Sequence, residues 1–530
     1  MGPHHPKRQA ELASNRPQIA VYNAYWSTAG GGESYAGGIA EVLRHDADVT
    51  LLSHEAFDVA ALAERLALNL DGVSVRVIDE CASLERASAD FDVLFNASYR
   101  SHGRNGARRG VCIVYFPDEP GGGAAQWQRQ AMALGNRFFG SSAPGVTLGD
   151  GFHPPDLVRW QEVRWTDGRG VLTFDPEAAG TCRLHLWIGR FVDKGEERQL
   201  EIAIDGHVVR TVTLKRPRTK FGLLEPLRIT IEIPDGSDIH TVELFSEASR
   251  PGGPDGNGDR RQLGVPLVGV TTGHRISSPL LGRVSVLRSE LLDTSWLQSY
   301  DTIVSISAFT ERWVAKWWNV ESIVIEPPVA MRQAGEKKNI ILAVGRFFAP
   351  GRGHSKKQLE MVEQFGRLVG GGLRDWELHL VGGCSPDDVP YLDQVRLAAE
   401  GLPVSIHVDA TGSELDELYA SASIFWHATG LGEDLETDPV RAEHFGMTTV
   451  EAMSAGAVPV VFDAGGQSDI VADGVDGFLF QDSEQWLESS MKLINNPLLR
   501  LSMGANAATT ALAFRREKFN SRIRSILGWN

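Results

Sequence analysis

The stretch EHFGMTTVEAMSAGAVPVVF, residues 443–462, decides the fold. It carries two carboxylates eight residues apart, Glu443 in a loop and Glu451 in a stretch with helical character from Thr448 to Ala455. The apolar, β-branched run from Val458 to Phe462 then predicts a buried strand. A loop, a helix and a buried strand in this order are typical of an α/β domain with a parallel sheet.

Four residues between the two glutamates occupy the predicted start of the helix: Phe445, Gly446, Met447 and Thr448. The free N–H groups and the dipole of a helix N-terminus favour a diphosphate, and glycine lets the backbone approach a ligand closely. Eight helical residues span ~12 Å, which is about the reach from a sugar ring across a diphosphate to a ribose. We therefore predict a nucleotide-sugar site; the alternative is an exposed loop acid beside a solvated helix acid.

A second α/β domain surrounds this stretch. Its remaining strand candidates are 340–344, 377–381, 404–408, 424–427 and 477–480, with helical segments at 356–369 and 413–422. The strand at 340–344 leads into Gly345 and Arg346, and Lys356 and Lys357 stand at the start of the next predicted helix. Cations in these positions can clamp a diphosphate and stabilise it as a leaving group, whereas the alternative is a solvated basic helix start.

The N-terminal part also alternates strands and helices, with strand candidates at 18–23, 49–53, 73–78, 92–96 and 111–116. The first strand leads into Ala29-Gly30-Gly31-Gly32-Glu33, which is not the GxGxxG pattern of a dinucleotide site. We predict that Gly31 and Gly32 open space for donor or acceptor; an ordinary tight turn is the alternative. Two such α/β domains facing each other leave a cleft at the carboxyl ends of their strands.

Between residues 171 and 270 the pattern changes to short strands separated by turn residues, which is typical of a β-sandwich. Because α/β character resumes at 296–329, we predict that the sandwich is inserted into the first domain. The predicted domains are 17–147 and 274–330 for the N-terminal Rossmann-like domain, 148–273 for the insertion and 331–512 for the C-terminal nucleotide-sugar-binding domain. A final helical segment, 513–530, is expected to pack back on the N-terminal domain.

The composition limits the partners. The formal net charge of −16 argues against a general nucleic-acid binder. The four cysteines form no CxxC pair, no apolar run approaches the ~20 residues of a membrane span, and the polar first residues lack a signal core. These features predict a cytoplasmic protein; peripheral contact with the inner face of a membrane stays open, and the oligomeric state is not fixed.

The segment from Asn339 to Phe480 resembles the C-terminal half of glycosyltransferase family 4, a family of retaining enzymes with the GT-B fold. The resemblance rests on GRFF…GHSKKQ, LYASASIFWHATG, the stretch quoted above with the following AGGQSDIV, and DGFLF. The N-terminal half is similar more loosely, through GGGES at 30–34, FNASY at 95–99, YFP at 115–117 and SYDTIVSISAFTERW at 299–313. By its GDRRQLGV at 258–265, the insertion resembles jelly-roll-like modules found in some bacterial glycosyltransferases.

The resemblance implies a role for each matching residue. Glu443 would contact the transferred sugar and Glu451 the ribose hydroxyls, while Arg346 and Lys356 would bind the diphosphate, with Lys357 beside them. Further sugar or acceptor contacts would come from three residues: Tyr115, Glu33 and His444. The family often has histidine where this chain has Tyr115, and a tyrosine hydroxyl can hydrogen-bond a sugar but carries no positive charge.

The predicted function is that of a retaining hexosyltransferase, as in polysaccharide biosynthesis. It would move a sugar from a nucleotide-diphosphate donor to a hydroxyl of a glycan or glycolipid by a front-face mechanism, with no metal and no other cofactor. Two alternatives remain: a carbohydrate-binding protein on a degenerate transferase scaffold, and a nucleotide-sugar epimerase of GT-B fold. The donor sugar, the base and the acceptor are not determined by the sequence.

Overall fold

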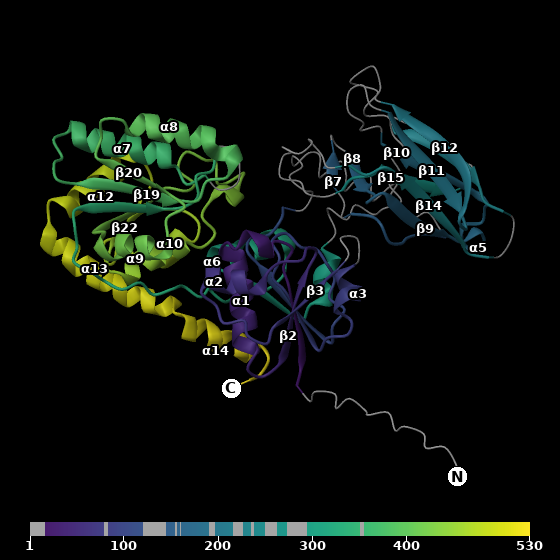
Figure 1. Ribbon diagram of the computed structural model, residues 1–530, viewed down its shortest axis with the longest axis horizontal. Coiled ribbons are helices and arrows are strands. Elements are labelled where there is room, and N and C mark those ends of the chain that lie inside the picture. Colours follow the sequence, from purple (N-terminus) through teal and green to yellow (C-terminus); the bar gives the residue numbers. More distant parts are fainter. Residues whose placement is uncertain are drawn as a thin grey trace, which may run out of the picture.

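The computed structural model describes residues 16–78, 83–119, 145–153, 156–158, 161–189, 197–215, 226–234, 238–249, 262–272, 294–349 and 355–529. Cys81, the polar leader and the GDRR part of the insertion motif lie outside these residues. The described strands form two parallel and two antiparallel sheets. Figure 1 shows the C-terminal sheet in green, the first strands of the N-terminal sheet in purple and the antiparallel strands in blue and teal.

The N-terminal Rossmann-like domain contains a seven-stranded parallel sheet of order β17-β16-β5-β4-β1-β2-β3. Its strands are β1 (Gln18–Tyr22), β2 (Asp48–Ser53), β3 (Ser74–Val77), β4 (Val93–Asn96), β5 (Arg109–Val114), β16 (Thr302–Ser305) and β17 (Ile323–Val324). Its helical segments are η1 (Trp26–Thr28), α1 (Gly31–Leu43), α2 (Val59–Leu66), α3 (Leu84–Ser88), η5 (Ser295–Ser299) and α6 (Ala308–Trp318).

Both faces of this sheet are covered. Ile19 and Val21 of β1 belong to one apolar core, whereas Ala20 and Tyr22 belong to another on the opposite face. Strands buried on both faces read as nearly continuous apolar runs, which is why these strands are recognisable in the sequence.

Between β5 and β16 the chain forms two five-stranded antiparallel sheets, of order β13-β10-β15-β8-β7 and β12-β11-β14-β9-β6. Their strands are β6 (Val146–Leu148), β7 (Asp156–Val158), β8 (Gln161–Trp165), β9 (Arg169–Phe174), β10 (Arg183–Ile188), β11 (Glu197–Ile204), β12 (His207–Lys215), β13 (Leu227–Glu232), β14 (His240–Ser246) and β15 (Pro266–Thr272); a short helix, α5 (Pro176–Ala179), follows β9. One core joins the two sheets, with Leu186 from the first and Ile202 from the second. The predicted sandwich is thus seen in part, and the predicted domain limits stay a prediction.

The C-terminal Rossmann-like domain has a six-stranded parallel sheet of order β20-β19-β18-β21-β22-β23. The strands are β18 (Ile340–Val344), β19 (Glu377–Gly382), β20 (Val404–Val408), β21 (Ile424–His427), β22 (Val458–Phe462) and β23 (Phe478–Phe480). The helical segments are α7 (Gln358–Gly370), η6 (Pro386–Asp388), α8 (Val389–Ala399), α9 (Gly412–Ser421), η7 (Pro439–Arg441), α10 (Met447–Ser454), α11 (Gln467–Ile470) and α12 (Ser483–Ile494).

One helix start differs from the prediction. The helix expected from Lys356 begins at Gln358 instead, because Lys357 has a left-handed backbone with φ of 60° and occupies the N-cap position of α7. Both lysines therefore lie in the loop before the helix.

The last helices connect the two Rossmann-like domains: α13 (Pro497–Ala511), η8 (Leu512–Phe514) and α14 (Arg516–Ile526) run from the C-terminal sheet to the N-terminal one (Figure 1). On α14, Phe519 is 3% exposed and its ring lies edge-on to Tyr35 of α1, with centroids 5.1 Å apart. A Cβ atom on Gly38 would lie 3.2 Å from Phe519, so this glycine permits the close approach of the two helices. Arg522 pairs with Glu326 at 2.6 Å, and both contacts hold α14 on the N-terminal domain.

Replacing Phe519 with alanine should loosen this attachment. Removal of a buried phenylalanine ring leaves a cavity and lowers the free energy of unfolding by about 3 kcal/mol. Urea unfolding followed by tryptophan fluorescence would measure the loss, with Leu512→Ala as the control because Leu512 is 49% exposed. An equal effect of the two substitutions would show that the Phe519 contact does not hold α14 in place.

Candidate functional site

The predicted donor residues gather at the carboxyl ends of the strands of the C-terminal sheet. Arg346 follows β18, His427 ends β21, and Glu443 lies in the loop that leads into α10. Ligands of open α/β sheets bind at this edge.

The carboxylate of Glu443 binds two partners from different segments. Lys356 Nζ lies 2.5 Å from Glu443 Oε2, and His427 Nε2 lies 3.1 Å from the same oxygen. Burial raises the pKa of Glu443, but the positive charge of Lys356 and the hydrogen bond from His427 outweigh it and hold the pKa well below its usual range. Burial lowers the pKa of His427, so its ring is neutral at neutral pH, and the ionised carboxylate accepts the Nε2 proton.

The glycine loop of the N-terminal domain lies against this part of the C-terminal domain. A Cβ atom on Gly30 would lie 3.1 Å from Nη2 of Arg346, and one on Gly31 would lie 3.4 Å from Sδ of Met447. The two loops are thus in close contact at Gly30, where a side chain would have to displace the end of Arg346, and in ordinary contact at Gly31. Arg346 is exposed, and no acidic side chain among the described residues forms an ion pair with it, which leaves its charge available to an anion.

The start of α10 is shaped by Gly446 and by two buried neighbours. Gly446 has φ of 120°, and a Cβ atom there would lie 2.8 Å from Nε2 of Gln467. Phe445 is buried in the core and meets Phe514 at 5.5 Å, so only its backbone can serve a donor. Thr448, one residue into the helix, is half-buried.

Glu451 is bound on both oxygens. Nη2 of Arg332 lies 2.6 Å from Oε1, and the hydroxyl of Tyr419 donates to Oε2 at 2.8 Å. A carboxylate has about four acceptor positions, so each oxygen can still accept a bond from a ribose hydroxyl. Arg332 and Tyr419 could not be predicted from the sequence, because they lie 119 and 32 residues away from Glu451 along the chain.

Lys357 is turned away from the predicted diphosphate position. Its side chain is 9% exposed and its Nζ pairs with Glu433 at 2.7 Å, while Arg441 lies 3.4 Å from the other oxygen of Glu433. Both oxygens of Glu433, in the acidic loop from Glu433 to Asp438, thus face a cation. In the part of the chain that the structure describes, no group of three or more histidine, cysteine, aspartate or glutamate side chains is arranged to hold a metal ion.

Three predicted sugar or acceptor contacts form bonds within the protein. The hydroxyl of Tyr115 lies 2.8 Å from the carbonyl oxygen of Gly32, and Glu33 accepts from the backbone N–H of Gly30 at 2.7 Å. His444 stacks on Phe116 of the N-terminal domain, with ring centroids 4.4 Å apart. These residues shape the glycine loop and the domain contact; their roles toward a substrate stay predictions.

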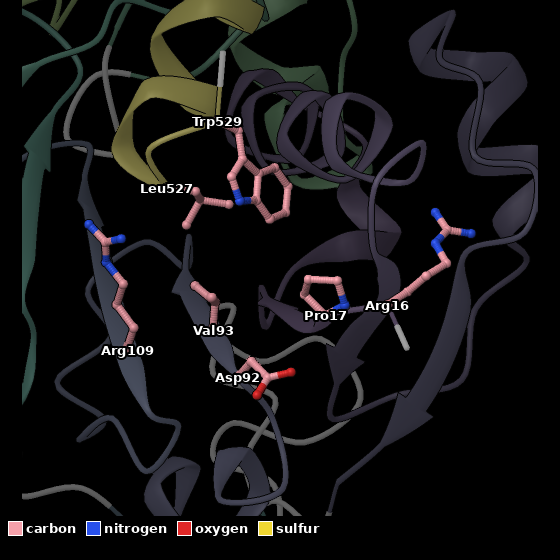
Figure 2. A pocket seen from close by; sticks show the side chains of 7 residues that line it. All are labelled: Arg16, Pro17, Asp92, Val93, Arg109, Leu527 and Trp529. Carbon is pink, nitrogen blue, oxygen red and sulfur yellow. The ribbon is translucent and has the colours of Figure 1, made fainter. Parts of the chain in front are cut away.

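A cavity of about 470 Å³ lies at the other edge of the N-terminal sheet, where β4 and β5 begin (Figure 2). Leu527 and Trp529 reach over it from the end of the chain. Arg109 in its wall donates to the carbonyl oxygen of Ile526 at 2.5 Å. It contains none of the predicted donor residues, so we do not assign it to the nucleotide.

Comparison with known proteins shows what the chain is similar to. Residues 330–510 match the family Glycosyl transferases group 1. The chain is similar to GDP-Man:Man(3)GlcNAc(2)-PP-Dol alpha-1,2-mannosyltransferases. The enzyme of Dictyostelium discoideum is 26% identical, over 33% of this chain and 35% of that protein. That of Neurospora crassa is 27% identical, over 42% and 44%, and that of Homo sapiens is 24% identical, over 41% and 46%. The chain spans less than half of the length of each of these three curated relatives.

Two solved structures share the fold. Anabaena HepE in complex with UDP and glucose has a TM-score of 0.51 and 12% identity, over 97% of this chain and 99% of that one. A glycosyltransferase from Rickettsia africae has a TM-score of 0.51 and 10% identity, over the same shares. The predicted GT-B fold, with two Rossmann-like domains, is confirmed.

Replacing Lys356 with methionine should expose the electrostatic role of this lysine. A carboxylate whose pKa is lowered in the folded state stabilises the fold above its unfolded pKa of about 4.3, and this contribution is lost as the pH falls through the folded value. We expect the variant to unfold more easily than the wild type by about 3 kcal/mol near neutral pH, with the difference shrinking as the pH falls below about 4.

Urea unfolding at a series of pH values would measure this difference, with Lys338→Met as the control because Lys338 is exposed. A difference that does not change with pH would contradict the assigned cause of the lowered pKa of Glu443.

Proposed function

We propose that this protein is a retaining glycosyltransferase that moves a hexose from a nucleotide-diphosphate sugar to a hydroxyl of a glycan or glycolipid. The observation that supports this most is the meeting of Glu443, Lys356 and His427 beside Arg346 and the start of α10. This cluster lies within the segment that matches Glycosyl transferases group 1.

Each charged group has a part in the proposed reaction. The diphosphate would bind between Arg346, Lys356 and the N–H groups at the start of α10. Lys356 would then contact both the diphosphate and the carboxylate of Glu443. The same carboxylate would accept hydrogen bonds from the sugar hydroxyls. Glu451 would accept hydrogen bonds from the ribose.

In the transfer step, the bond between the anomeric carbon and the phosphate oxygen breaks, and the acceptor oxygen bonds to the same face of that carbon. The acceptor proton passes to the leaving phosphate oxygen, and the nucleoside diphosphate departs with both electrons of the broken bond. Arg346 and Lys356 stabilise the charge that develops on it. Because these cations and the helix N-terminus neutralise the leaving group, no metal ion is needed in this proposal.

The names of the relatives suggest the first substrates to test. Three of them are mannosyltransferases that use GDP-mannose and a dolichol-linked glycan, which supports a mannose donor and a lipid-linked saccharide acceptor. No helix in the described parts of the chain has the length and apolar character needed to cross a membrane. We propose a cytoplasmic location with peripheral contact at the inner face of the membrane.

The function is tested with a panel of GDP-, UDP-, ADP- and TDP-linked sugars and saccharide acceptors. We expect release of the nucleoside diphosphate from one donor, a product with the anomeric configuration of that donor by NMR, and unchanged turnover in EDTA. Inversion at the anomeric carbon would contradict the front-face step, and activity restored only by magnesium or manganese would contradict metal independence. An epimerised donor or binding without turnover would favour the two alternative functions.

The two motif glutamates should fail in different ways. Glu443→Gln removes the charge that orients the sugar and should lower kcat roughly 100-fold. Glu451→Gln weakens a bond to the ribose and should raise the donor KM about tenfold, since a hydrogen bond to a charged group contributes ~1.5 kcal/mol.

Steady-state kinetics would separate these effects. Arg332 keeps Asp416 as a partner at 2.5 Å in the Glu451 variant, so its charge is not left alone. Glu436→Gln, in the exposed part of the acidic loop, is the control. Near-normal kinetics for both motif variants would show that the active site lies elsewhere.

A further inference from the structure

The backbone turns sharply at the second of the two adjacent lysines. Lys357, at the N-cap position of α7, has φ of 60° and ψ of 35°, which lie in the left-handed region. A residue at an N-cap normally has extended backbone, and the left-handed region is unfavourable for any residue with a Cβ atom. Such conformations persist only where the surrounding structure holds them, and they are concentrated at functional sites.

The residues on both sides of Lys357 are fixed beside the predicted diphosphate position. The aliphatic part of Lys356 crosses Gly345, where a Cβ atom would lie 2.8 Å from Cγ of the lysine. The buried amide of Gln358 donates to the carbonyl oxygens of Gly345 and Arg346 at 3.1 and 3.0 Å. The conformation of Lys357 therefore determines where Lys356 points relative to Arg346.

An ion pair holds the side chain of Lys357. Its Nζ lies 2.7 Å from Oε1 of Glu433, and the two side chains are only 9% and 23% exposed. A second acid, Glu360, is more distant at 3.8 Å. Arg441 lies 3.4 Å from the other oxygen of Glu433 and is itself bound to Asp438 at 2.6 Å. Glu433 is thus held from both sides and gives Lys357 a fixed partner.

The two neighbouring lysines are bound by two acids of one loop. Glu433 and Glu443 are ten residues apart in the segment between β21 and α10. Glu433 pairs with Lys357, and Glu443 pairs with Lys356. The two pairs fix the lysine turn and the loop of the acids against each other, and the left-handed backbone lets adjacent side chains reach both acids.

We propose that Glu433 is a positioning residue of the transferase: through its ion pair with Lys357 it holds the left-handed turn that directs Lys356 to the diphosphate. This role rests on the proposed function. Lys357 then acts through its backbone, because its charge is used by Glu433. A displacement of about 1 Å near the reacting atoms can lower a rate roughly 100-fold, so a contact that fixes the turn affects catalysis without touching the substrate.

The first comparison is Glu433→Gln with Glu436→Gln, which changes an exposed acid of the same loop. Without the carboxylate, the ammonium of Lys357 would turn toward water and leave the turn unsupported. We expect Glu433→Gln to lower kcat about tenfold and to change the donor KM by less than about threefold, because Arg346 and the ribose contact remain. Calorimetry with GDP and UDP gives the fraction of molecules that bind nucleotide, so that a loss of folded protein is not mistaken for a loss of kcat.

The second comparison separates the turn from the charge. Lys357→Gly and Lys357→Ala, each combined with Glu433→Gln, remove the same ammonium group, but only glycine adopts left-handed backbone without a penalty. We expect the glycine double variant to have a kcat roughly fivefold above that of the alanine double variant. Urea unfolding of the two single Lys357 variants tests the turn without activity, and the glycine variant should unfold at the higher urea concentration.

Three results would overturn the proposed role of Glu433. They are a kcat of Glu433→Gln equal to that of Glu436→Gln, an equal kcat of the two double variants, and a Lys357→Ala protein that resists urea as well as Lys357→Gly. An equal kcat of the double variants would mean that the charge of Lys357, and not the turn, is what matters. A wild type that binds neither nucleotide and releases no nucleoside diphosphate from any donor would instead refute the proposed function.

Discussion

A buried negative charge holds the C-terminal half of the site together. The carboxylate of Glu443 draws Lys356 from the loop before α7 and His427 from the end of β21 toward the loop that precedes α10. These segments come from three separate parts of the sequence, and a charge withdrawn from water must find such partners or lose its ionisation. The geometry of the site is therefore a condition of stability as well as of chemistry.

The second half of the site depends on how closely the two domains approach. His444 stacks on Phe116, and Phe445 and Val450 belong to the same apolar core as the residues of β1 and α14. The glycine loop can then reach Arg346 because Gly30 has no side chain to collide with it. A cleft between two separate lobes would bring these groups together only when a ligand binds, whereas here the packed core already holds them near one another.

Apart from β16 and β17, for which no strand was predicted, the sequence predicts the parallel strands to within two residues, and the buried ones are recognisable because strands covered on both faces must be apolar throughout. It also predicts the start of α10, because the residues that mark this helix start, Gly446 and those after it, are neighbours in the sequence. It does not predict partners that meet only in the fold, such as Arg332 on Glu451 or Lys357 on Glu433, because an ordinary arginine or lysine gives no sign of which acid it will reach.

The ion pair of Arg332 with Glu451 joins the segment that connects the two domains to the predicted ribose position. Arg332 lies three residues after Val329, whose N–H bonds to the carbonyl oxygen of Phe514 in the segment that leads into α14. The connection between the domains is thus held at one end by the carboxylate expected to meet the ribose. Because Arg332 lies in this connection, a substitution of Glu451 would remove a contact of the connection as well as the carboxylate expected to meet the ribose.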